Sequence, residues 1–246
     1  METMADVKHR IRAAILVESG RPLVVDEIQF PGELKAGQVF VKVLYSGICG
    51  SQIGEIDAKK GKDHYLPHLL GHEGSAQVMA TGPGVTFVKP GDKAVMHWRK
   101  GNGIDAAPPD YQWQGRKLNA GFVTTFNTYA VVSENRLTVI DEADMAMDIA
   151  PLMGCAVTTG LGVVENNARV KIGESVVVLG AGGVGLNMVQ GAAMSSAHPV
   201  VAVDLHDNRL AMAEKFGATH RVRARDTADL ENQLRDILGP AGADVV

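Results

Sequence analysis

Apolar and polar positions alternate in short runs through the first half of the chain. Segments rich in Val, Ile and Leu are separated by turns that contain Gly and Pro, and this pattern predicts β-strands. The polar stretch 97–119, which contains two consecutive prolines, is interpreted as a long loop. Many short strands with frequent turns favour a closed or sandwiched β domain. The predicted strands are 12–17, 23–30, 39–46, 77–80, 93–97 and 128–132.

The pattern changes near residue 148. Positions 149–167 show the helical spacing of apolar residues, with breaks at Gly154 and Gly160. Strands and helices then alternate, which indicates right-handed βαβ units on a parallel sheet. We therefore predict a β domain over residues 1–150, followed by an incomplete Rossmann-type, doubly wound α/β sheet over residues 151–246. The alternating elements are strand 175–179, helix 184–195, strand 200–204, helix 208–216, strand 220–223, helix 227–238 and a strand that begins at Asp244.

Composition limits the classes of partner. Hydrophobic residues make up 46% of the chain, enough for a sizeable core, and the formal net charge is only −4. No basic stripe is present, so we expect no nucleic-acid partner. The longest apolar stretch, 176–186, is too short to span a membrane, and the charged N-terminus is not a secretory signal. We therefore expect a cytoplasmic protein whose two cysteines stay reduced.

A G-x-G-x-x-G motif lies between the predicted strand 175–179 and the helix after it, the context that makes this motif informative. Gly180 permits a tight turn, Gly182 lets the backbone approach a pyrophosphate, and Gly185 lets helix and strand pack closely. Asp204 ends the next strand, where a carboxylate accepts from a ribose 2′-hydroxyl. A Gly-rich turn in a flavodoxin-like fold is the alternative. The predicted dinucleotide residues are Gly180, Gly182, Gly183, Val184, Gly185, Asp204 and Arg209.

Asp204 also predicts which dinucleotide binds. Its negative charge would repel the 2′-phosphate of NADP, and Leu205 beside it offers no positive charge. Arg209 is the one nearby residue that weakens this prediction. We therefore expect NAD rather than NADP as the cofactor.

The two cysteines become informative together with His72. One His and two thiolates leave a fourth position open, as in a catalytic rather than a structural zinc site. Cys49, His72 and Cys155 are far apart in the chain, so their spacing alone does not prove a site. Cys155 could instead be a buried helix cysteine. His64 and His68 are interpreted as loop residues rather than ligands.

The motifs around these residues carry a family resemblance. Residues 70–74 form a Leu-Gly-His-Glu-Gly block, and a Val-Lys-Pro-Gly-Asp turn follows at 88–92. A block with Gly-Cys and Thr-Gly, at 154–160, lies shortly before the dinucleotide motif. From about Arg12 to its last residue the chain resembles the zinc-dependent alcohol dehydrogenases of the medium-chain dehydrogenase/reductase superfamily. The resemblance implies a GroES-like catalytic domain followed by a Rossmann coenzyme domain.

On matching positions, the resemblance implies roles for further side chains. Ser51 corresponds to the hydroxyl that takes the substrate proton, and Glu73 to the acid beside the metal. Thr159 corresponds to a contact to the nicotinamide, with Val184 behind the ring. The implied reaction is hydride transfer between an alcohol held at zinc and NAD, with the proton passed outward through Ser51. The implied zinc ligands are Cys49, His72 and Cys155.

Two departures from the family pattern lie near the predicted metal site. The family often has His where Gly54 stands, so the proton relay is expected to be shorter or to use water. The family usually has Asp where Gln52 stands, and we expect the uncharged amide of Gln52 to support His72 in its place. Glu55 or Asp57 could serve instead.

Substrate and class stay open at this level. Trp98 falls where the family places a large pocket residue. A simple alcohol, a polyol and a glutathione adduct of formaldehyde all remain possible substrates. One catalytic zinc is expected and no structural zinc, because the cysteines of the family's four-cysteine loop are missing. A zinc-free quinone-reductase-type enzyme and a non-catalytic fragment that binds NAD or zinc are the alternatives, and the three ligands argue against the former.

The end of the chain suggests a longer protein. Val246 falls inside an apparent strand that would be central in a Rossmann sheet. We therefore expect the chain to be a fragment of a homo-oligomeric enzyme. Alone, it is expected to form the zinc site but to bind NAD weakly, turn over little and not dimerise.

Overall fold

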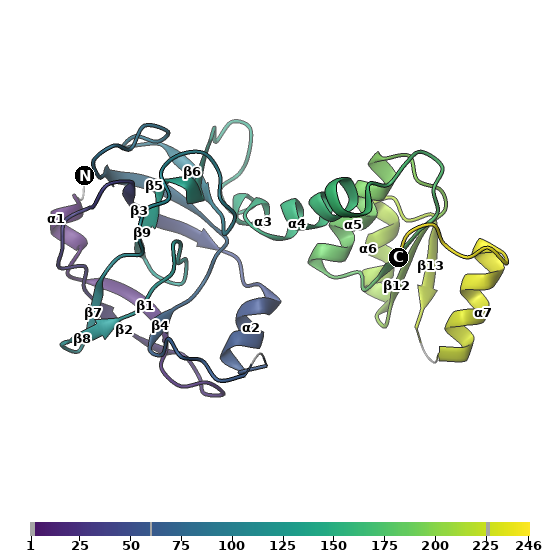
Figure 1. The fold of residues 1–246 in the computed structure, drawn as a ribbon, viewed down its shortest axis with the longest axis horizontal. Helices are drawn as coiled ribbons and strands as arrows, with labels where there is room; N and C mark the ends of the chain where they lie inside the picture. The colour runs from purple at the N-terminus through teal and green to yellow at the C-terminus, as the bar shows by residue number, and fades with distance from the viewer. Residues whose placement is uncertain (1–2, 60, 225–226) are drawn as a thin grey trace. The chain divides into compact units, whose positions relative to one another are not determined.

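The computed structural model describes residues 3–59, 61–224 and 227–246. The chain divides into two compact units, residues 1–155 and residues 156–246 (Figure 1). The first is built on antiparallel sheets and the second on a parallel sheet with helices. The predicted order of a β domain followed by a Rossmann-type α/β sheet is therefore confirmed.

The first unit contains two main sheets and a hairpin. Its strands are β1 (Ile11–Leu16), β2 (Val24–Ile28), β3 (Gln38–Ser46), β4 (His68–Leu69), β5 (Gly74–Thr81), β6 (Lys93–Met96), β7 (Tyr111–Trp113), β8 (Arg116–Leu118), β9 (Tyr129–Ser133) and β10 (Leu137–Ile140). The sheet orders are β2-β1-β4 and β10-β6-β5-β3-β9, and β7 pairs with β8. Its helical segments are α1 (Met4–Val7), α2 (Gly50–Ile56), the 3-10 turn η1 (Glu134–Arg136) and α3 (Ala150–Met153).

Alternation along β3 divides the core of the first unit in two. Phe40 packs into one apolar cluster, whereas Val39 and Val41 pack into a second cluster. The ring of Phe40 stacks on Tyr129 of the neighbouring strand β9, with centroids 5.7 Å apart. Successive side chains of a strand point to opposite faces, so β3 is covered on both sides.

The predicted long loop 97–119 is wrong in part, because it contains the β7–β8 hairpin. Tyr111 and Trp113 of β7 and Leu118 of β8 are buried. The turn residues Gln114 and Gly115 both have positive φ, 51° and 73°, as a two-residue hairpin turn requires. Burial of these three side chains outweighs the polar character of the segment around them.

Buried Glu134 fastens the loop that precedes this hairpin. Its Oε1 accepts from the backbone N–H groups of Thr86 and Phe87 at 2.6 and 2.8 Å, and its Oε2 accepts from Ile104 at 2.8 Å. Burial acts to raise the pKa of Glu134, but the three N–H donors outweigh it and hold the pKa below its ordinary value. The ionised carboxylate therefore stabilises the fold.

The second unit has a three-stranded parallel sheet of order β11-β12-β13. Its elements are α4 (Ala156–Gly162), the π-helical turn η2 (Val163–Ala168), β11 (Val176–Leu179), α5 (Gly183–Met194), β12 (Val200–Asp204), α6 (Asp207–Lys215), β13 (His220–Arg223) and α7 (Thr227–Leu238). Val245 adds one parallel bridge to Val176, where a further strand was predicted. The predicted break at Gly160 is wrong, because Gly160 lies inside α4 and packs against α5, where a Cβ would come within 2.5 Å of Asn187.

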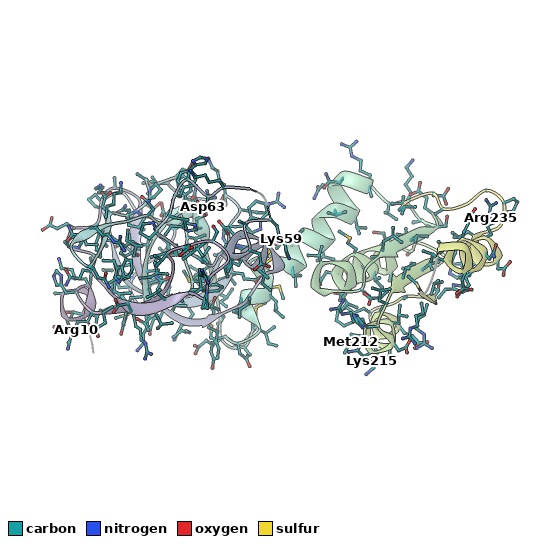
Figure 2. The ribbon with its side chains drawn as sticks, turned by 90° about the horizontal axis from the view of Figure 1, so that it is seen from below. Arg10, Lys59, Asp63, Met212, Lys215 and Arg235 are labelled. Carbon is teal, nitrogen blue, oxygen red and sulfur yellow. The ribbon has the colours of Figure 1, made fainter. Side chains whose placement is uncertain are left out.

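Helices cover both faces of this sheet. Val176 and Val178 pack in one cluster with residues of α5 and α6, whereas Val177 packs in another cluster against α7. Figure 1 shows α7 beside β13. The outer sides of the helices carry exposed charged side chains, including Lys215 on α6 and Arg235 on α7 (Figure 2). Among the described residues, no helix has the length and apolar character needed to cross a membrane.

We predict that Glu134→Gln destabilises the first unit by about 1–3 kcal/mol at neutral pH, because an amide N–H₂ group replaces one of the acceptors of three part-buried backbone hydrogen bonds. Both tryptophans, Trp98 and Trp113, lie in the first unit, so urea unfolding followed by tryptophan fluorescence reports on that unit.

The difference in unfolding free energy between the parent chain and Glu134→Gln should shrink in acid. The folded-state pKa of Glu134 is depressed, so its contribution is present above the unfolded-state pKa and is lost as pH falls through the folded-state pKa. Glu142→Gln is the matched control, since that exposed carboxylate lies 3.4 Å from Lys93 at the surface. Equal urea midpoints for both variants at neutral pH would contradict the prediction.

Candidate metal centre and dinucleotide site

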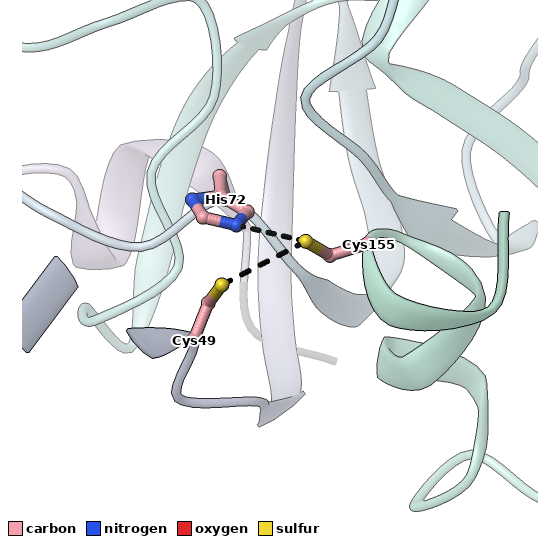
Figure 3. Close-up of side chains that lie close together, drawn as sticks. All are labelled: Cys49, His72 and Cys155. Carbon is pink, nitrogen blue, oxygen red and sulfur yellow. Dashed lines mark hydrogen bonds between the residues drawn. The ribbon is translucent and has the colours of Figure 1, made fainter. Parts of the chain in front are cut away.

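Three side chains from distant parts of the first unit converge. The ligand atoms of Cys49, His72 and Cys155 all lie within 4.8 Å of one another. The Cys155 sulfur is 3.3 Å from Nε2 of His72 and 3.9 Å from the sulfur of Cys49 (Figure 3). Cys155 is buried, and the other two side chains are partly buried. The structure thus brings together the three predicted zinc ligands.

The register of the central sheet brings Cys49 to His72. Ser46, the last residue of β3, pairs with Gly74, the first residue of β5. Cys49 follows β3 closely and caps the N-terminus of α2, whereas His72 lies just before β5. Because β3 and β5 are antiparallel neighbours, the end of one strand and the start of the other lie at the same edge. The two ligands therefore meet although twenty-two residues separate them.

Cys155 reaches the same edge through the turn after α3. Met96, at the end of β6, lies in the next strand of the same sheet. A Cβ on Gly154 would collide with the carbonyl oxygen of Met96, so only glycine lets the turn approach so closely. The Ser75 hydroxyl on β5 donates to the carbonyl of Met147 at 2.6 Å. This bond ties the segment before α3 to the sheet.

Zinc fits these three ligand atoms. Tetrahedral coordination with bonds of about 2.3 Å to sulfur and about 2.0 Å to nitrogen separates two sulfurs by about 3.8 Å, and a sulfur and a nitrogen by about 3.5 Å. The observed separations are 3.9 Å and 3.3 Å. Burial lowers the pKa of His72 and so favours the neutral ring that binds metals.

Gln52 contacts the other side of the His72 ring, as predicted. Nε2 of Gln52 lies 2.8 Å from Nδ1 of His72. Oε1 of Gln52 is buried and has no hydrogen-bond partner. A ring that binds metal through Nε2 carries its proton on Nδ1 and needs an acceptor there. A half-turn of the Gln52 amide places Oε1 on that proton, and the buried oxygen then gains its partner.

Glu73 and Ser51 flank the cluster differently. Glu73 is 5% exposed and packs against Gly47, where a Cβ would lie only 2.7 Å from its carboxyl carbon. Burial raises the pKa of Glu73. Ser51 is exposed on α2, two residues after Cys49. The position of Glu73 next to His72 in the chain keeps a buried carboxyl close to the cluster.

The interpretation of His68 as a loop residue is wrong. It belongs to β4 and is buried. Its Nε2 lies 2.7 Å from the Asp63 carboxylate and its Nδ1 lies 3.0 Å from the carbonyl of Leu69. Burial acts to raise the pKa of Asp63, but hydrogen bonds from Tyr65 and His68 outweigh it and lower the pKa. His64 is exposed and takes no part in the cluster.

The glycine motif of the second unit has the conformation that its sequence predicts. Gly180 has φ of +94°, a region that L side chains rarely adopt. A Cβ on Gly185 would collide with the carbonyl oxygen of Gly180, so the loop and α5 can approach only with glycine there. A Cβ on Gly182 would meet open space, which leaves its backbone accessible to a ligand. Gly183 begins α5, whose N–H groups favour anions.

Asp204 is the last residue of β12, and its carboxylate also accepts a hydrogen bond from the glycine loop. Its Oδ2 accepts from the N–H of Ala181 at 2.8 Å and its Oδ1 from the N–H of His206 at 2.9 Å. Arg209 lies 3.6 Å from the same carboxylate. Burial acts to raise the pKa of Asp204, but these donors outweigh it and lower the pKa.

Thr159 and Val184 lie on helices that pack together, α4 and α5. Both are partly buried. A Cβ on Gly160, next to Thr159, would come within 2.7 Å of the carbonyl oxygen of Val184. Glycine at this position therefore lets the helix that carries Thr159 approach the first turn of α5.

Sequence reasoning missed the helix α2. The segment that carries Ser51 and Gln52 contains glycines at positions 50 and 54, which disfavour a helix. The contact of Gln52 with His72 was expected only from the family pattern, and no local pattern of apolar residues around Gln52 predicts its burial. Trp98, the predicted pocket residue, is 49% exposed, and the centroid of its ring lies 5.9 Å from the guanidinium carbon of Arg99.

Family models match both units. The alcohol dehydrogenase GroES-like domain model matches residues 35–142, and the zinc-binding dehydrogenase model matches residues 183–246. Together with the three-ligand cluster and the glycine loop, these matches define a zinc-dependent medium-chain dehydrogenase. The chain belongs to the zinc-dependent alcohol dehydrogenase family of the medium-chain dehydrogenase/reductase superfamily.

Curated relatives agree with this family. The chain is 33% identical to the S-(hydroxymethyl)glutathione dehydrogenase of Paracoccus denitrificans, with 93% of this chain and 66% of the relative covered. It is 34% identical to the class-3 alcohol dehydrogenase of Cereibacter sphaeroides, with 87% and 63% covered. It is 31% identical to the S-(hydroxymethyl)glutathione dehydrogenase of Escherichia coli O1:K1 / APEC, with 92% and 67% covered. The chain thus spans about two thirds of the length of these relatives.

Solved structures show the same fold. An alcohol dehydrogenase zinc-binding domain protein from Burkholderia ambifaria is 26% identical with a TM-score of 0.81, and the benzyl alcohol dehydrogenase of Acinetobacter calcoaceticus is 28% identical with a TM-score of 0.79. In each case 92% of this chain and 67% of the other chain are covered.

We predict that Gln52→Ala weakens zinc binding by about 10- to 100-fold, because the Nδ1–H of a metal-bound His72 then lacks its buried acceptor. Gln52→Glu should bind zinc at least as tightly as the parent chain, since a carboxylate is a stronger acceptor. The measurement is zinc affinity by competition with a chromophoric chelator. Gln112→Ala, at an exposed position of β7, is the matched control. Unchanged zinc affinity in Gln52→Ala would show that the contact does not support the ligand.

Proposed function

We propose that this protein transfers a hydride between a small-molecule alcohol and NAD, or in reverse from NADH to the aldehyde or ketone, at a single catalytic zinc. The convergence of Cys49, His72 and Cys155 carries the proposal, because one imidazole and two thiolates leave a coordination position for substrate. The similar proteins support the same class, since they include a dehydrogenase of S-(hydroxymethyl)glutathione and a dehydrogenase of benzyl alcohol. The cytoplasmic location and the homo-oligomeric assembly remain predictions.

The chain's own residues have distinct tasks in this reaction. Zinc, when bound, supplies a Lewis acid that lowers the pKa of an alcohol hydroxyl, and NAD supplies the hydride acceptor. Cys49, His72 and Cys155 hold the metal, and Gln52 orients the imidazole. The buried carboxyl of Glu73 lies beside these ligands in the chain. Thr159, on α4, and Val184, in the first turn of α5, are assigned to the nicotinamide.

Ser51 is assigned to the proton. Its hydroxyl is exposed on α2, two residues after Cys49, so it can take a proton from the substrate hydroxyl and pass it to water. Gly54, one helical turn further on, has no side chain to extend the path. We therefore propose a relay with Ser51 as its one protein member and solvent as the next acceptor.

Two other classes predict different behaviour. A non-catalytic binding protein would hold zinc and NAD without turnover. A zinc-free reductase of the quinone-reductase type would act on activated double bonds and would not need the thiolates. The sub-4 Å spacing of the two sulfurs favours the zinc enzyme over the zinc-free one.

We predict one zinc per chain and a slow alcohol-dependent rise of NADH absorbance, because little turnover is expected of this chain alone. Cys155→Ser should lose both the zinc and the turnover. Ser51→Ala should keep the zinc but slow the turnover by about 100-fold or more, because the positioned proton acceptor is removed. His64→Asn, at an exposed histidine outside the cluster, should change neither. Two tightly bound zincs, or zinc without NADH formation on any alcohol, would count against the proposal.

NAD is proposed as the cofactor because of Asp204. Its carboxylate is fixed by two backbone N–H groups at the end of β12, beside the glycine loop. A fixed negative charge there repels a 2′-phosphate and accepts from a free 2′-hydroxyl. Arg209 lies against this carboxylate, so much of its positive charge is offset.

We predict that Asp204→Ala reduces the preference for NAD over NADP at least about tenfold, since it removes the repulsion and leaves Arg209 without its partner. The measurement is the ratio of dissociation constants for the two reduced dinucleotides, taken from the fluorescence of bound NADH and NADPH. Asp236→Ala, at an exposed acid on α7, should leave the ratio unchanged. Equal affinity of the parent chain for both dinucleotides would overturn the assignment.

A further inference from the structure

A cavity of about 430 Å³ opens beside His72 in the first unit. It is bounded by α2 with Gln52 and Glu55, by the segment from β4 to His72, and by residues 119–123. Its volume falls within the roughly 300–1,000 Å³ of small-molecule sites. Because Gln52 and His72 form part of its lining, the cavity adjoins one ligand of the proposed metal centre.

Two aromatic residues and a small-residue segment shape the walls. Tyr65 and Phe122 line the cavity and are 72% and 40% exposed, so they stand where it meets solvent. Ala120 and Gly121 also line it and contribute almost no bulk. Leu70, 3% exposed, supplies apolar surface further in. Aromatic side chains that line a free volume suit a ring of a ligand.

The ring of Phe122 also contacts a buried cation. The Arg136 guanidinium lies 5.2 Å from the centroid of the Phe122 ring. Arg136 is 5% exposed, and its Nε and Nη1 atoms are buried without a hydrogen-bond partner. A guanidinium with few hydrogen bonds gains from an aromatic face, so this contact favours one position of the ring. Asp105, 3.6 Å from Arg136, offsets part of the charge.

The charges at the cavity are unfavourable for anions. None of the described residues that line it is Lys or Arg. Glu55 lines it with a carboxylate, and the lining residue His68 already faces Asp63 at 2.7 Å. Lys59, on the segment after α2 and labelled with Asp63 in Figure 2, pairs with Asp57 at 3.5 Å. An anionic ligand would lose hydration here and meet Glu55.

We propose that this cavity receives the uncharged, aromatic body of the alcohol and discriminates against anionic alcohols. The proposal rests on the proposed function, because it places the substrate body next to the metal ligand His72. Phe122 and Tyr65 contact the ring of the substrate, and Glu55 repels a negative charge on it. An adduct of a thiol peptide that carries carboxylates is thereby disfavoured, and a benzylic alcohol is favoured.

Three alcohols that share one ring test the charge preference: benzyl alcohol, 4-(hydroxymethyl)benzoate and 4-(aminomethyl)benzyl alcohol. The zinc-loaded 246-residue chain is titrated with each, and dissociation constants are read from ligand NMR signals, which need no turnover. Benzyl alcohol is expected to bind at least about tenfold more tightly than the carboxylate. Glu55→Gln should reduce this discrimination by up to about fivefold and leave benzyl alcohol unchanged.

Phe122→Ala tests the aromatic wall. It should weaken the binding of benzyl alcohol by about three- to tenfold and leave the binding of ethanol unchanged. Phe87→Ala is the matched control, because Phe87 is also exposed, at 56%, and does not line the cavity. Equal dissociation constants for the three alcohols would overturn the cavity assignment. The same loss of benzyl alcohol affinity in Phe122→Ala and Phe87→Ala would also overturn it.

Failure of the proposed function has a different signature. In that case benzyl alcohol still binds, and binding still falls in Phe122→Ala, but no alcohol produces NADH. If NADH forms from alcohols while the carboxylate binds as tightly as benzyl alcohol, the function stands and the cavity assignment fails.

Discussion

Two thiolate ligands and one imidazole have to be held together although they come from positions 49, 72 and 155. The two sulfurs lie 3.9 Å apart, so once both lose their protons to bind metal they would repel each other, and a neutral ring would offset little of that repulsion. A divalent cation turns the repulsion into attraction, so the spacing of the ligands and the binding of metal depend on each other. The first unit supplies the rigid frame: the ends of β3, β5 and β6 form one row, and each ligand is attached near that row.

The frame is made rigid by buried polar groups whose partners are mostly backbone N–H groups or single side chains. Glu134 fastens two loops with one carboxylate, and Asp63 with His68 closes the segment between α2 and β4. Gln52 stands apart, because one of its two polar atoms has no partner until His72 changes its tautomer. A buried atom of this kind costs free energy, which metal binding recovers. The uncharged amide therefore couples the fold of α2 to the state of the metal centre.

In the second unit, a few buried polar groups likewise shape the site of a different ligand. Gly180 and Gly185 let the backbone turn and approach, and the carboxylate of Asp204 accepts from the N–H groups of Ala181 and His206. A carboxylate held in this way keeps its charge at the end of β12, where it can select between a hydroxyl and a phosphate on the ribose. In both units, functional selectivity depends on charges that burial and hydrogen bonds keep in one protonation state.

The sequence by itself determined what short-range patterns encode. Short apolar runs bounded by turn residues placed strands such as β3 and β12, and the glycine motif followed by Asp204 placed the dinucleotide loop, because a turn, a strand end and a helix start depend on neighbouring residues. The two cysteines and the G-H-E block named the metal ligands through resemblance. Only the tertiary structure decided α2, the β7–β8 hairpin, the burial of His68 and the cavity beside His72. Gly50 and Gly54 disfavour a helix locally, and Gln52 becomes buried only because packing brings α2 to His72. Contacts of this kind join residues far apart in the chain, and their register depends on the whole sheet rather than on any one segment.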